Sequence, residues 1–444
     1  MKYYSTNHNV PEVSLKEAVI QGLASDNGLF MPKGIEKFQP SFFEKIQHLS
    51  FQEIAFEVAK MFFGEDIPEN TLREIVFDTL QFDCPVVKVT DSIYSLELFY
   101  GPTLAFKDVG ARFMARLLKY FLGKTNEKVN VLVATSGDTG SAVANGFLGV
   151  DGIHVYVLYP KGKVSSIQES QFTTLGKNIT AIEIEGTFDD CQRLVKLAFL
   201  DKELNRKLKL TSANSINVAR FLPQAFYYFN AYARLKEEGI LNGKELVIAV
   251  PSGNFGNITA GLFAREMGLP VKYFIAANNA NNVVFEYLKT GRYNSRPSVE
   301  TIANAMDVGA PSNFVRILDL YDHEHERISA VMKGAWYSDD KIRNVVRKVY
   351  ETTGYLCDPH GACGFESLFE TLGKNEVGVF LETAHPGKFL DTMEEIIGKG
   401  KIELPLKLKE FMRGEKMNIK LNSDYKGFKD FLEDMVNKAS KIRT

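Results

Sequence analysis

Two short glycine-containing loops share one pattern and are the first candidates for chemistry in this chain. Thr135-Ser-Gly-Asp-Thr-Gly and Pro251-Ser-Gly-Asn-Phe-Gly-Asn each follow a short apolar run and precede a helix-like segment. Glycines let the backbone approach an anion closely, and free N–H groups at the start of a helix favour negative charge. A tight turn into a helix produces the same pattern, so each loop alone is a weak signal. Together they predict two anionic groups held in one cleft.

Lys107 is the candidate nucleophile. It lies in the run 103–111, where a helix would place it on the same face as Gly110, Ala111 and Met114. A lysine on such a small, apolar face is expected to be partly buried. Burial lowers its pKa and frees the amine to act as a nucleophile. The alternative is a lysine whose stem is buried while its ammonium group reaches solvent.

These features together predict a cofactor. Pyridoxal 5'-phosphate requires a lysine for a Schiff base, a phosphate cup and an enclosing cleft. Its ring nitrogen also needs a partner, and Thr383 offers a hydroxyl after a predicted strand over 377–381. The same threonine is equally well explained as the N-cap of a following helix. No metal site is predicted, because the spacing of His323 and His325 places them on different sides of a helix.

The elements that must position these residues alternate between strands and helices from about residue 100. Strands are predicted at 129–134, 153–159, 179–184, 246–250, 271–276 and 377–381, each with a helical pattern nearby. Such alternation predicts parallel sheets covered on both faces by helices. Ligands bind at the carboxyl ends of strands in such sheets, which is where both glycine loops lie.

The two ends of the chain differ from this alternation. The first 90 residues are mostly helical by pattern, with a Ser-x-x-Glu capping box opening a helix at Ser14 and a turn over 26–32. A hairpin is predicted over 84–98. Near the C-terminus, one amphipathic helix carrying Phe428 and Leu432 is expected to pack on the body. The predicted units are an N-terminal domain at 1–90, a catalytic region of two α/β lobes at 91–390, and a helical tail at 391–444.

Composition excludes several classes of protein. The chain has 444 residues, 53 Lys+Arg against 55 Asp+Glu and a net charge of −2, which argues against a nucleic-acid or anionic-membrane binder. With 45% hydrophobic residues it is not disordered. Four cysteines form no disulfide framework, which favours the cytoplasm. We see no signal peptide, and no apolar run approaches the ~18 residues of a membrane span.

Four separated motifs, in order, resemble those of the threonine synthase family. They are Gly101-Pro-Thr-Leu-Ala-Phe-Lys-Asp, Thr135-Ser-Gly-Asp-Thr-Gly, Pro251-Ser-Gly-Asn-Phe-Gly-Asn and Thr383-Ala-His-Pro. Further similar blocks are Tyr4-Ser-Thr, Asp26-Asn-Gly-Leu-Phe-Met-Pro, Asn214-Ser-Ile-Asn-Val-Ala-Arg-Phe-Leu-Pro-Gln and Ala305-Met-Asp-Val-Gly-Ala-Pro-Ser-Asn-Phe. The resemblance covers about residues 4–390, and the remainder matches loosely.

The resemblance implies a pyridoxal-phosphate-dependent, tryptophan-synthase-β-like α/β fold (fold type II). This fold would have two open parallel-sheet lobes plus a mostly helical N-terminal domain. The implied enzyme is a carbon–oxygen lyase acting on phosphate. It would convert O-phospho-L-homoserine and water to L-threonine and phosphate by γ-elimination and addition of water at the β-carbon.

Roles for individual residues also follow from the resemblance. Lys107 would hold the cofactor as a Schiff base and act as the catalytic base, and Thr383 would face the ring nitrogen. The cofactor phosphate would lie in a cup made of Gly253, Asn254, Phe255, Gly256 and Asn257. The substrate would be held by Ser136, Gly137, Asp138 and Thr139, and its phosphate by Asn214, Ser215, Asn217 and Arg220. Related enzymes often have asparagine where this chain has Asp138, so its contact with the cofactor hydroxyl is in doubt.

Two other functions remain open from the sequence. One is another enzyme of the same fold, such as a serine/threonine dehydratase or a β-replacement synthase. The other is a non-catalytic, ligand-binding derivative. A phosphate site at Arg220 argues against a dehydratase, which needs no such cation, and Lys107 with Thr383 argues against pure binding. The resemblance favours a monomer whose partner is a small-molecule substrate, with neither nucleic acid nor membrane.

Overall fold

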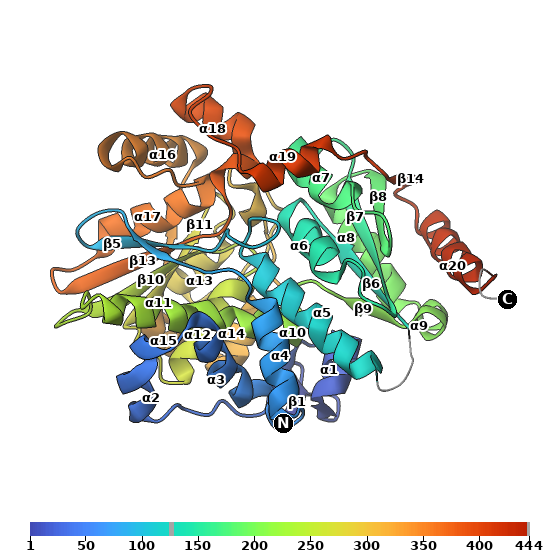
Figure 1. The fold of residues 1–444 in the computed structure, drawn as a ribbon, viewed down its shortest axis with the longest axis horizontal. Helices are drawn as coiled ribbons and strands as arrows, with labels where there is room; N and C mark the ends of the chain where they lie inside the picture. The colour runs from blue at the N-terminus through green and yellow to red at the C-terminus, as the bar shows by residue number, and fades with distance from the viewer. Residues whose placement is uncertain (124–127, 442–444) are drawn as a thin grey trace.

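Two sheets dominate the computed structural model, which describes residues 1–123 and 128–441. The strand order is β12-β11-β10-β13-β5-β4 in the larger sheet and β14-β8-β7-β6-β9 in the smaller one. They lie on the left and right of Figure 1. Neighbouring strands are parallel throughout both sheets except at the antiparallel edge strand β4. The expected α/β architecture with two parallel-sheet lobes is therefore confirmed, as is the β4–β5 hairpin.

The central strands are short, apolar and buried on both faces, whereas β4, β12 and β14 at the sheet edges are partly exposed. The larger sheet contains β4 (Val86–Lys88), β5 (Ile93–Glu97), β10 (Glu245–Pro251), β11 (Tyr273–Asn278), β12 (Met332–Trp336) and β13 (Glu376–Glu382). The smaller contains β6 (Val129–Ala134), β7 (Ile153–Pro160), β8 (Ile179–Glu185), β9 (Leu210–Ser212) and β14 (Ile419–Asn422). All seven residues of β13 are buried, as expected for a parallel strand with helices on both sides.

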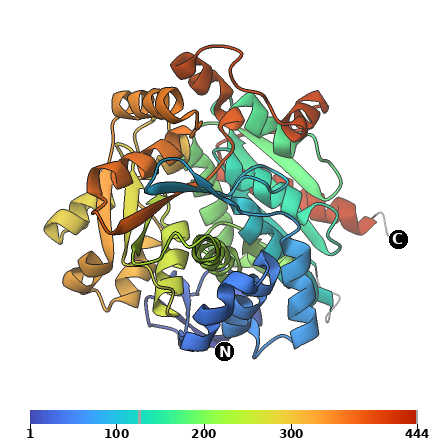
Figure 2. The ribbon, with the colours of Figure 1, turned by 60° about the vertical axis from the view of Figure 1, so that its left-hand side comes forward.

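Helices cover both faces of each sheet (Figure 2). One face of the larger sheet packs on α16 (Asp339–Thr353), α17 (Pro359–Thr371) and α18 (Leu390–Ile397). One face of the smaller sheet packs on α8 (Phe188–Leu200), α9 (Lys202–Leu208) and α20 (Tyr425–Lys441). The lobes also contain α6 (Asp138–Phe147), α7 (Ser166–Thr173), α13 (Val283–Thr290), α14 (Phe314–Leu320) and α15 (His325–Val331).

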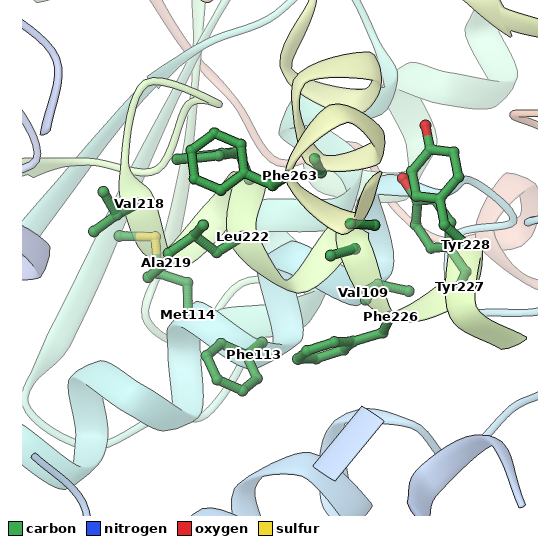
Figure 3. Packing of buried hydrophobic residues seen from close by; sticks show 14 of the residues in the cluster. Val109, Phe113, Met114, Val218, Ala219, Leu222, Phe226, Tyr227, Tyr228 and Phe263 are labelled. Atoms are coloured by element: carbon green, nitrogen blue, oxygen red, sulfur yellow. The ribbon is translucent and has the colours of Figure 1, made fainter. Parts of the chain in front are cut away.

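The main core lies between the two sheets and centres on four helices. These are α5 (Lys107–Gly123), α10 (Val218–Phe221), α11 (Ala225–Glu237) and α12 (Gly256–Glu266). Figure 3 shows Val109, Phe113 and Met114 of α5 packed with Val218, Ala219, Leu222, Phe226 and Phe263, all of them buried. Burying so much apolar surface on α5 fixes the direction of the helix and therefore the place of its first residue, Lys107.

The N-terminal region is mostly helical, as expected, and carries one small sheet in addition. Its helices are α1 (Leu15–Gln21), α2 (Pro40–Lys45), α3 (Phe51–Phe63) and α4 (Glu69–Thr79), and the capping box at Ser14 is confirmed. A three-stranded antiparallel sheet is also present, with strands β1 (Lys2–Ser5), β2 (Val13–Ser14) and β3 (Phe30–Pro32). Our expectation of a turn over 26–32 was therefore incomplete, because strands this short show no readable alternation.

The C-terminal tail is not purely helical. It contains α18, α19 (Leu406–Arg413), β14 and α20, and β14 adds to the smaller sheet beside β8. The amphipathic helix is confirmed as α20, with Phe428 and Leu432 fully buried against the body. Strand β14 alternates apolar and polar residues, but over only four positions, so sequence pattern missed it. The boundaries 1–90, 91–390 and 391–444 stay a prediction.

Across 1–123 and 128–441, no helix combines the length and the apolar character needed to cross a membrane.

Helix α5 is held against α10 by a contact that only glycine permits. A Cβ on Gly110 would lie well inside van der Waals contact with the Arg220 carbonyl oxygen, which is rigid backbone. We expect Gly110→Ala to lower the free energy of unfolding by about 1–3 kcal/mol, because the two helices must separate. The matched control is Gly123→Ala at the other end of α5, where no described atom lies within 4 Å of the new methyl group. Chemical denaturation of both variants tests this, and equal stability would contradict it.

Candidate active site

One cleft of about 360 Å³ lies between the two lobes and collects most of the residues selected from the sequence. It is built from segments that follow strands: Lys107 after β5, Ser136 and Thr139 after β6, Asn214 and Ser215 after β9, Gly253–Asn257 after β10, and Thr383 after β13. Because the carboxyl ends of parallel strands meet at one edge of each sheet, segments distant in sequence converge there.

Backbone hydrogen bonds place Lys107 opposite Thr383. The Phe106 N–H donates to the Thr383 carbonyl oxygen at 2.9 Å, and the His385 N–H donates to the Leu104 carbonyl oxygen at 3.1 Å. These bonds tie the loop before α5 to the segment that leaves β13. Lys107 is half-buried and lines the cleft, as expected for a nucleophile enclosed by protein.

The environment of Lys107 raises the share of its neutral amine. Burial lowers the pKa of Lys107 to about 8; the negative charge of Asp138 opposes this shift, while Lys388 and Arg220 add to it. An exposed lysine has a pKa near 10.4. At pH 7 roughly one Lys107 side chain in ten is therefore uncharged and nucleophilic, against fewer than about one in a thousand for an exposed lysine.

The loop after β10 has the shape of a phosphate cup. A Cβ on Gly253 would lie 2.7 Å from the Ala305 carbonyl oxygen and 2.8 Å from the Met306 Cα, so only glycine fits there. Phe255 has a φ of +62°, a left-handed conformation that turns the chain into α12. Gly256 and Asn257, the first residues of α12, line the cleft, and the start of a helix favours an anion.

Two polar groups beside the cup remain without partners among the described residues. Asn257 accepts hydrogen bonds at its Oδ1 from the hydroxyls of Tyr227 (2.6 Å) and Tyr228 (2.7 Å), but its buried Nδ2 has no acceptor. Arg220 donates from Nη1 to the Lys107 carbonyl oxygen at 3.3 Å, while its buried Nε has no acceptor. Burial lowers the pKa of Arg220 to about 10, so it remains a cation near neutral pH.

A second polar group of side chains adjoins the cup at Ser215. Its hydroxyl oxygen accepts hydrogen bonds from Nδ2 of Asn254 at 2.8 Å and from Nδ2 of Asn313 at 3.0 Å. Asn214, Ser215 and Arg220 all line the cleft. The cleft therefore contains two neighbouring places suited to an anion, one at Gly253–Asn257 and one near Arg220.

Three expected substrate residues do not line the cleft. The Gly137 N–H donates to the Thr135 hydroxyl oxygen at 2.9 Å, so this donor is already used. The Asp138 carboxylate is buried and paired with Lys388 at 2.6 Å. Asn217 caps α10 through Oδ1 and donates from Nδ2 to backbone oxygens, so its amide is also satisfied. For Asp138 and Asn217 the sequence gives no sign of this, because Lys388 and the Val19 carbonyl oxygen are distant in the chain.

The structure also brings in cleft residues that sequence reasoning left without a role. Helix α8 contributes three of them, Phe188, Asp189 and Gln192. The segments on either side of η3 (Asn304–Met306) contribute Arg296, Pro297, Ser298, Asp307, Val308, Gly309 and Ala310. His360 lines the cleft as well, with its Nδ1 2.9 Å from Asp358 and its Nε2 accepting from the Ala305 N–H at 3.1 Å. The family block beginning at Ala305 was the one signal pointing to this segment.

The residues present fit pyridoxal 5'-phosphate. Lys107 supplies a partly desolvated amine, Gly253–Asn257 supply a cup that admits no side chain at Gly253, and Thr383 supplies a hydroxyl across the cleft from Lys107. The unpartnered Asn257 Nδ2 and Arg220 Nε are donors that acceptor-rich ligands would satisfy. A ligand with a carbonyl group and a phosphate thus matches the chemistry of the cleft.

Comparisons with known proteins agree with this geometry. Family models described as "Threonine synthase N terminus", "Pyridoxal-phosphate dependent enzyme" and "Threonine synthase, C-terminal" match residues 2–80, 86–381 and 361–432. A threonine synthase of Buchnera aphidicola is 43% identical over 433 residues, which is 97% of this chain and 99% of that protein.

Solved structures give the same result. The crystal structure of threonine synthase from Escherichia coli is 40% identical with a TM-score of 0.92, covering 98% of this chain and 100% of that one. A threonine synthase from Brucella melitensis with bound pyridoxal phosphate is 33% identical with a TM-score of 0.90, covering 97% and 98% of the two chains. Similarity therefore extends through both lobes and both terminal regions.

The pKa of Lys107 predicts how the cofactor-free protein reacts. The rate at which Lys107 captures pyridoxal phosphate should rise with pH and level off just above pH 8, because only the neutral amine attacks. An ordinary lysine would keep gaining reactivity until pH ~10.4. Borohydride reduction at timed intervals, followed by peptide mapping, measures this rate at Lys107. If the capture rate at Lys107 still rises above pH 9.5, as it does for exposed lysines, the pKa of Lys107 is not lowered and the prediction is wrong.

Proposed function

The chain belongs to the threonine synthase family, and we propose that its cleft carries out that family's reaction. In this reaction O-phospho-L-homoserine and water become L-threonine and phosphate by γ-elimination and addition of water at the β-carbon. The protein is a pyridoxal-phosphate-dependent carbon–oxygen lyase. The observation that carries the proposal is the position of Lys107, half-buried between two anion-binding places in one cleft.

Two anion-binding places suit a reaction in which both cofactor and substrate carry phosphate. The cup at Gly253–Asn257 is assigned to the cofactor phosphate. The backbone of Ala305 and Met306 lies so close to Gly253 that no side chain fits there, which leaves the backbone of the cup open to a phosphate. Arg220, with Asn214 and Ser215, is assigned to the substrate phosphate, where a charged donor suits a dianion. Ser136 and Thr139, at the start of α6, are assigned to the substrate carboxylate.

The chemistry of the bound cofactor is to withdraw electrons from the substrate's α-carbon. Lys107 moves the protons: its lowered pKa lets the amine accept a proton near neutral pH and return it at a neighbouring carbon. Thr383 would face the ring nitrogen of the bound cofactor with a neutral hydroxyl, where a carboxylate would hold that nitrogen protonated. Arg220 would hold the phosphate as it departs from the γ-carbon.

The same geometry favours a synthase over its two alternatives. A dehydratase acting on serine or threonine has no substrate phosphate, yet Arg220 stands buried in the cleft with an unpartnered Nε. A purely ligand-binding derivative has no need of a lysine whose pKa is lowered to about 8.

A cytoplasmic location also belongs to the proposal, supported by Cys84, Cys191, Cys357 and Cys363 as free thiols. A monomeric state rests on family resemblance alone.

The direct test of the proposal is Lys107→Ala. We expect the wild-type protein to show the visible absorbance band of bound cofactor, to shift this band on adding O-phospho-L-homoserine, and to release threonine and phosphate in equal amounts. Lys107→Ala should lose the covalent band and all turnover, because no amine remains to hold the cofactor or move protons. A band without phosphate release in the wild type would favour the dehydratase. Normal turnover in Lys107→Ala would reject the scheme.

The assignment of Arg220 predicts a substrate-specific loss. Arg220→Gln should lower kcat/KM for O-phospho-L-homoserine by roughly 10- to 100-fold, because a charged hydrogen bond to the phosphate is removed. Affinity for pyridoxal phosphate should change much less, since the cofactor phosphate lies in the other cup. Arg193→Gln on the exposed side of α8, where Arg193 pairs with Asp190, serves as the control. Equal losses of cofactor and substrate affinity would contradict the assignment.

A further inference from the structure

One buried ion pair joins three of the segments that build the cleft. Lys388, in η4 (Pro386–Phe389), has no exposed side-chain surface, and its ammonium group lies 2.6 Å from the Asp138 carboxylate. The same ammonium group donates to the Thr103 carbonyl oxygen at 2.7 Å. Lys388 follows β13, Asp138 follows β6 and Thr103 follows β5, so a single amine links the larger sheet to the smaller one.

Further hydrogen bonds hold each partner of Lys388 in place. Gln168 of α7 donates to the Asp138 Oδ1 at 2.9 Å, and Gln171 donates to the Thr103 carbonyl oxygen at 3.0 Å. Thr103 in turn donates from its hydroxyl and its N–H to the Asp108 carboxylate, at 2.7 Å and 2.8 Å. The loop that leads to Lys107 and the loop at the start of α6 are thereby fixed to each other.

The pair also determines the charge beside the reacting amine. Three charged groups on other elements act on Lys107: Asp138 from α6, Lys388 from η4 and Arg220 from α10. On α5 itself, Asp108 is directed to Thr103. Burial opposes the ionisation of Asp138, yet Lys388, Lys107 and the hydrogen bond from Gln168 hold the pKa of Asp138 well below its usual range. The carboxylate is therefore fully charged near neutral pH, and Lys388 balances it.

We propose that Lys388 and Asp138 form one positioning unit for the reaction: the pair holds the loops around Lys107 in register and keeps the local charge beside its amine balanced. This inference rests on the proposed function, because it concerns the amine that takes up the cofactor. It also gives Asp138 a role other than contact with the cofactor hydroxyl. Where an asparagine would be neutral by itself, Asp138 is neutralised by Lys388.

The two single variants should shift the reactivity of Lys107 in opposite directions. Lys388→Met leaves the Asp138 charge unbalanced, which stabilises the Lys107 ammonium. The pH at which Lys107 captures the cofactor at half its plateau rate, called the midpoint below, should therefore rise by roughly one unit. Asp138→Asn leaves Lys388 and Arg220 facing Lys107 and should lower that midpoint. The double variant Asp138→Asn/Lys388→Met removes one charge of each sign and should return the midpoint close to the wild-type value.

The measurement is the pH dependence of pyridoxal-phosphate capture at Lys107 in cofactor-free protein, with thermal unfolding of the same samples. Lys388→Met should unfold at a lower temperature than the double variant, because it leaves Asp138 buried and unpaired. If Lys388→Met does not fold, Asp138→Asn and the double variant still give the comparison. The control is Lys88→Met, which removes an exposed lysine paired with the equally exposed Asp91 and should change neither the midpoint nor the unfolding temperature.

The outcomes separate this inference from the proposed function. Opposite midpoint shifts that cancel in the double variant support the positioning unit. If all variants lose stability but the midpoint of capture at Lys107 does not change, the Lys388–Asp138 pair only stabilises the fold. That result would overturn the inference. A wild-type protein that captures no cofactor at Lys107 would instead overturn the proposed function.

Discussion

The site depends on the burial of α5 between the two sheets. Its apolar face packs into the main core, and Gly110 lets its backbone touch that of α10 at Arg220. Since Lys107 is the first residue of α5, the packing of the helix decides where the amine is and how little water reaches it. The lowered pKa of Lys107 is thus a property of the core as much as of the cleft. Burial that stabilises the fold also prepares the nucleophile.

The cleft keeps polar groups that the ligand-free protein does not satisfy. Arg220 Nε and Asn257 Nδ2 are buried without acceptors among the described residues. Each such group costs about 1–3 kcal/mol of folding stability. A ligand that supplies acceptors recovers this free energy on binding, so the protein gives up some stability for affinity. Neighbouring groups do have partners, as at Asn217 and Asp138, and these fix the backbone instead.

Both terminal regions act as supports for the lobes. Arg316 is fully buried and donates to the carbonyl oxygens of Phe30, Ser215 and Ile216, so it joins β3 to the segment assigned to the substrate phosphate. At the other end, β14 extends the smaller sheet beside β8. Buried backbone oxygens require such partners, which explains why a guanidinium with several donors occupies this position.

Sequence by itself determined the class of fold, the central strands, the amphipathic helices, Lys107 and the glycine loop at Gly253. These features are local, because strand and helix periods and glycine's freedom are set by neighbouring residues. Family motifs added the cofactor and the reaction. Tertiary structure alone decided that Asp138 pairs with Lys388, that Asn217 caps α10, and that β3 and β14 are strands. The ion pair and the two strands depend on partners distant in the chain, of which local pattern carries no record, and the Asn217 cap is local but its amide also bonds the distant Val19 carbonyl oxygen.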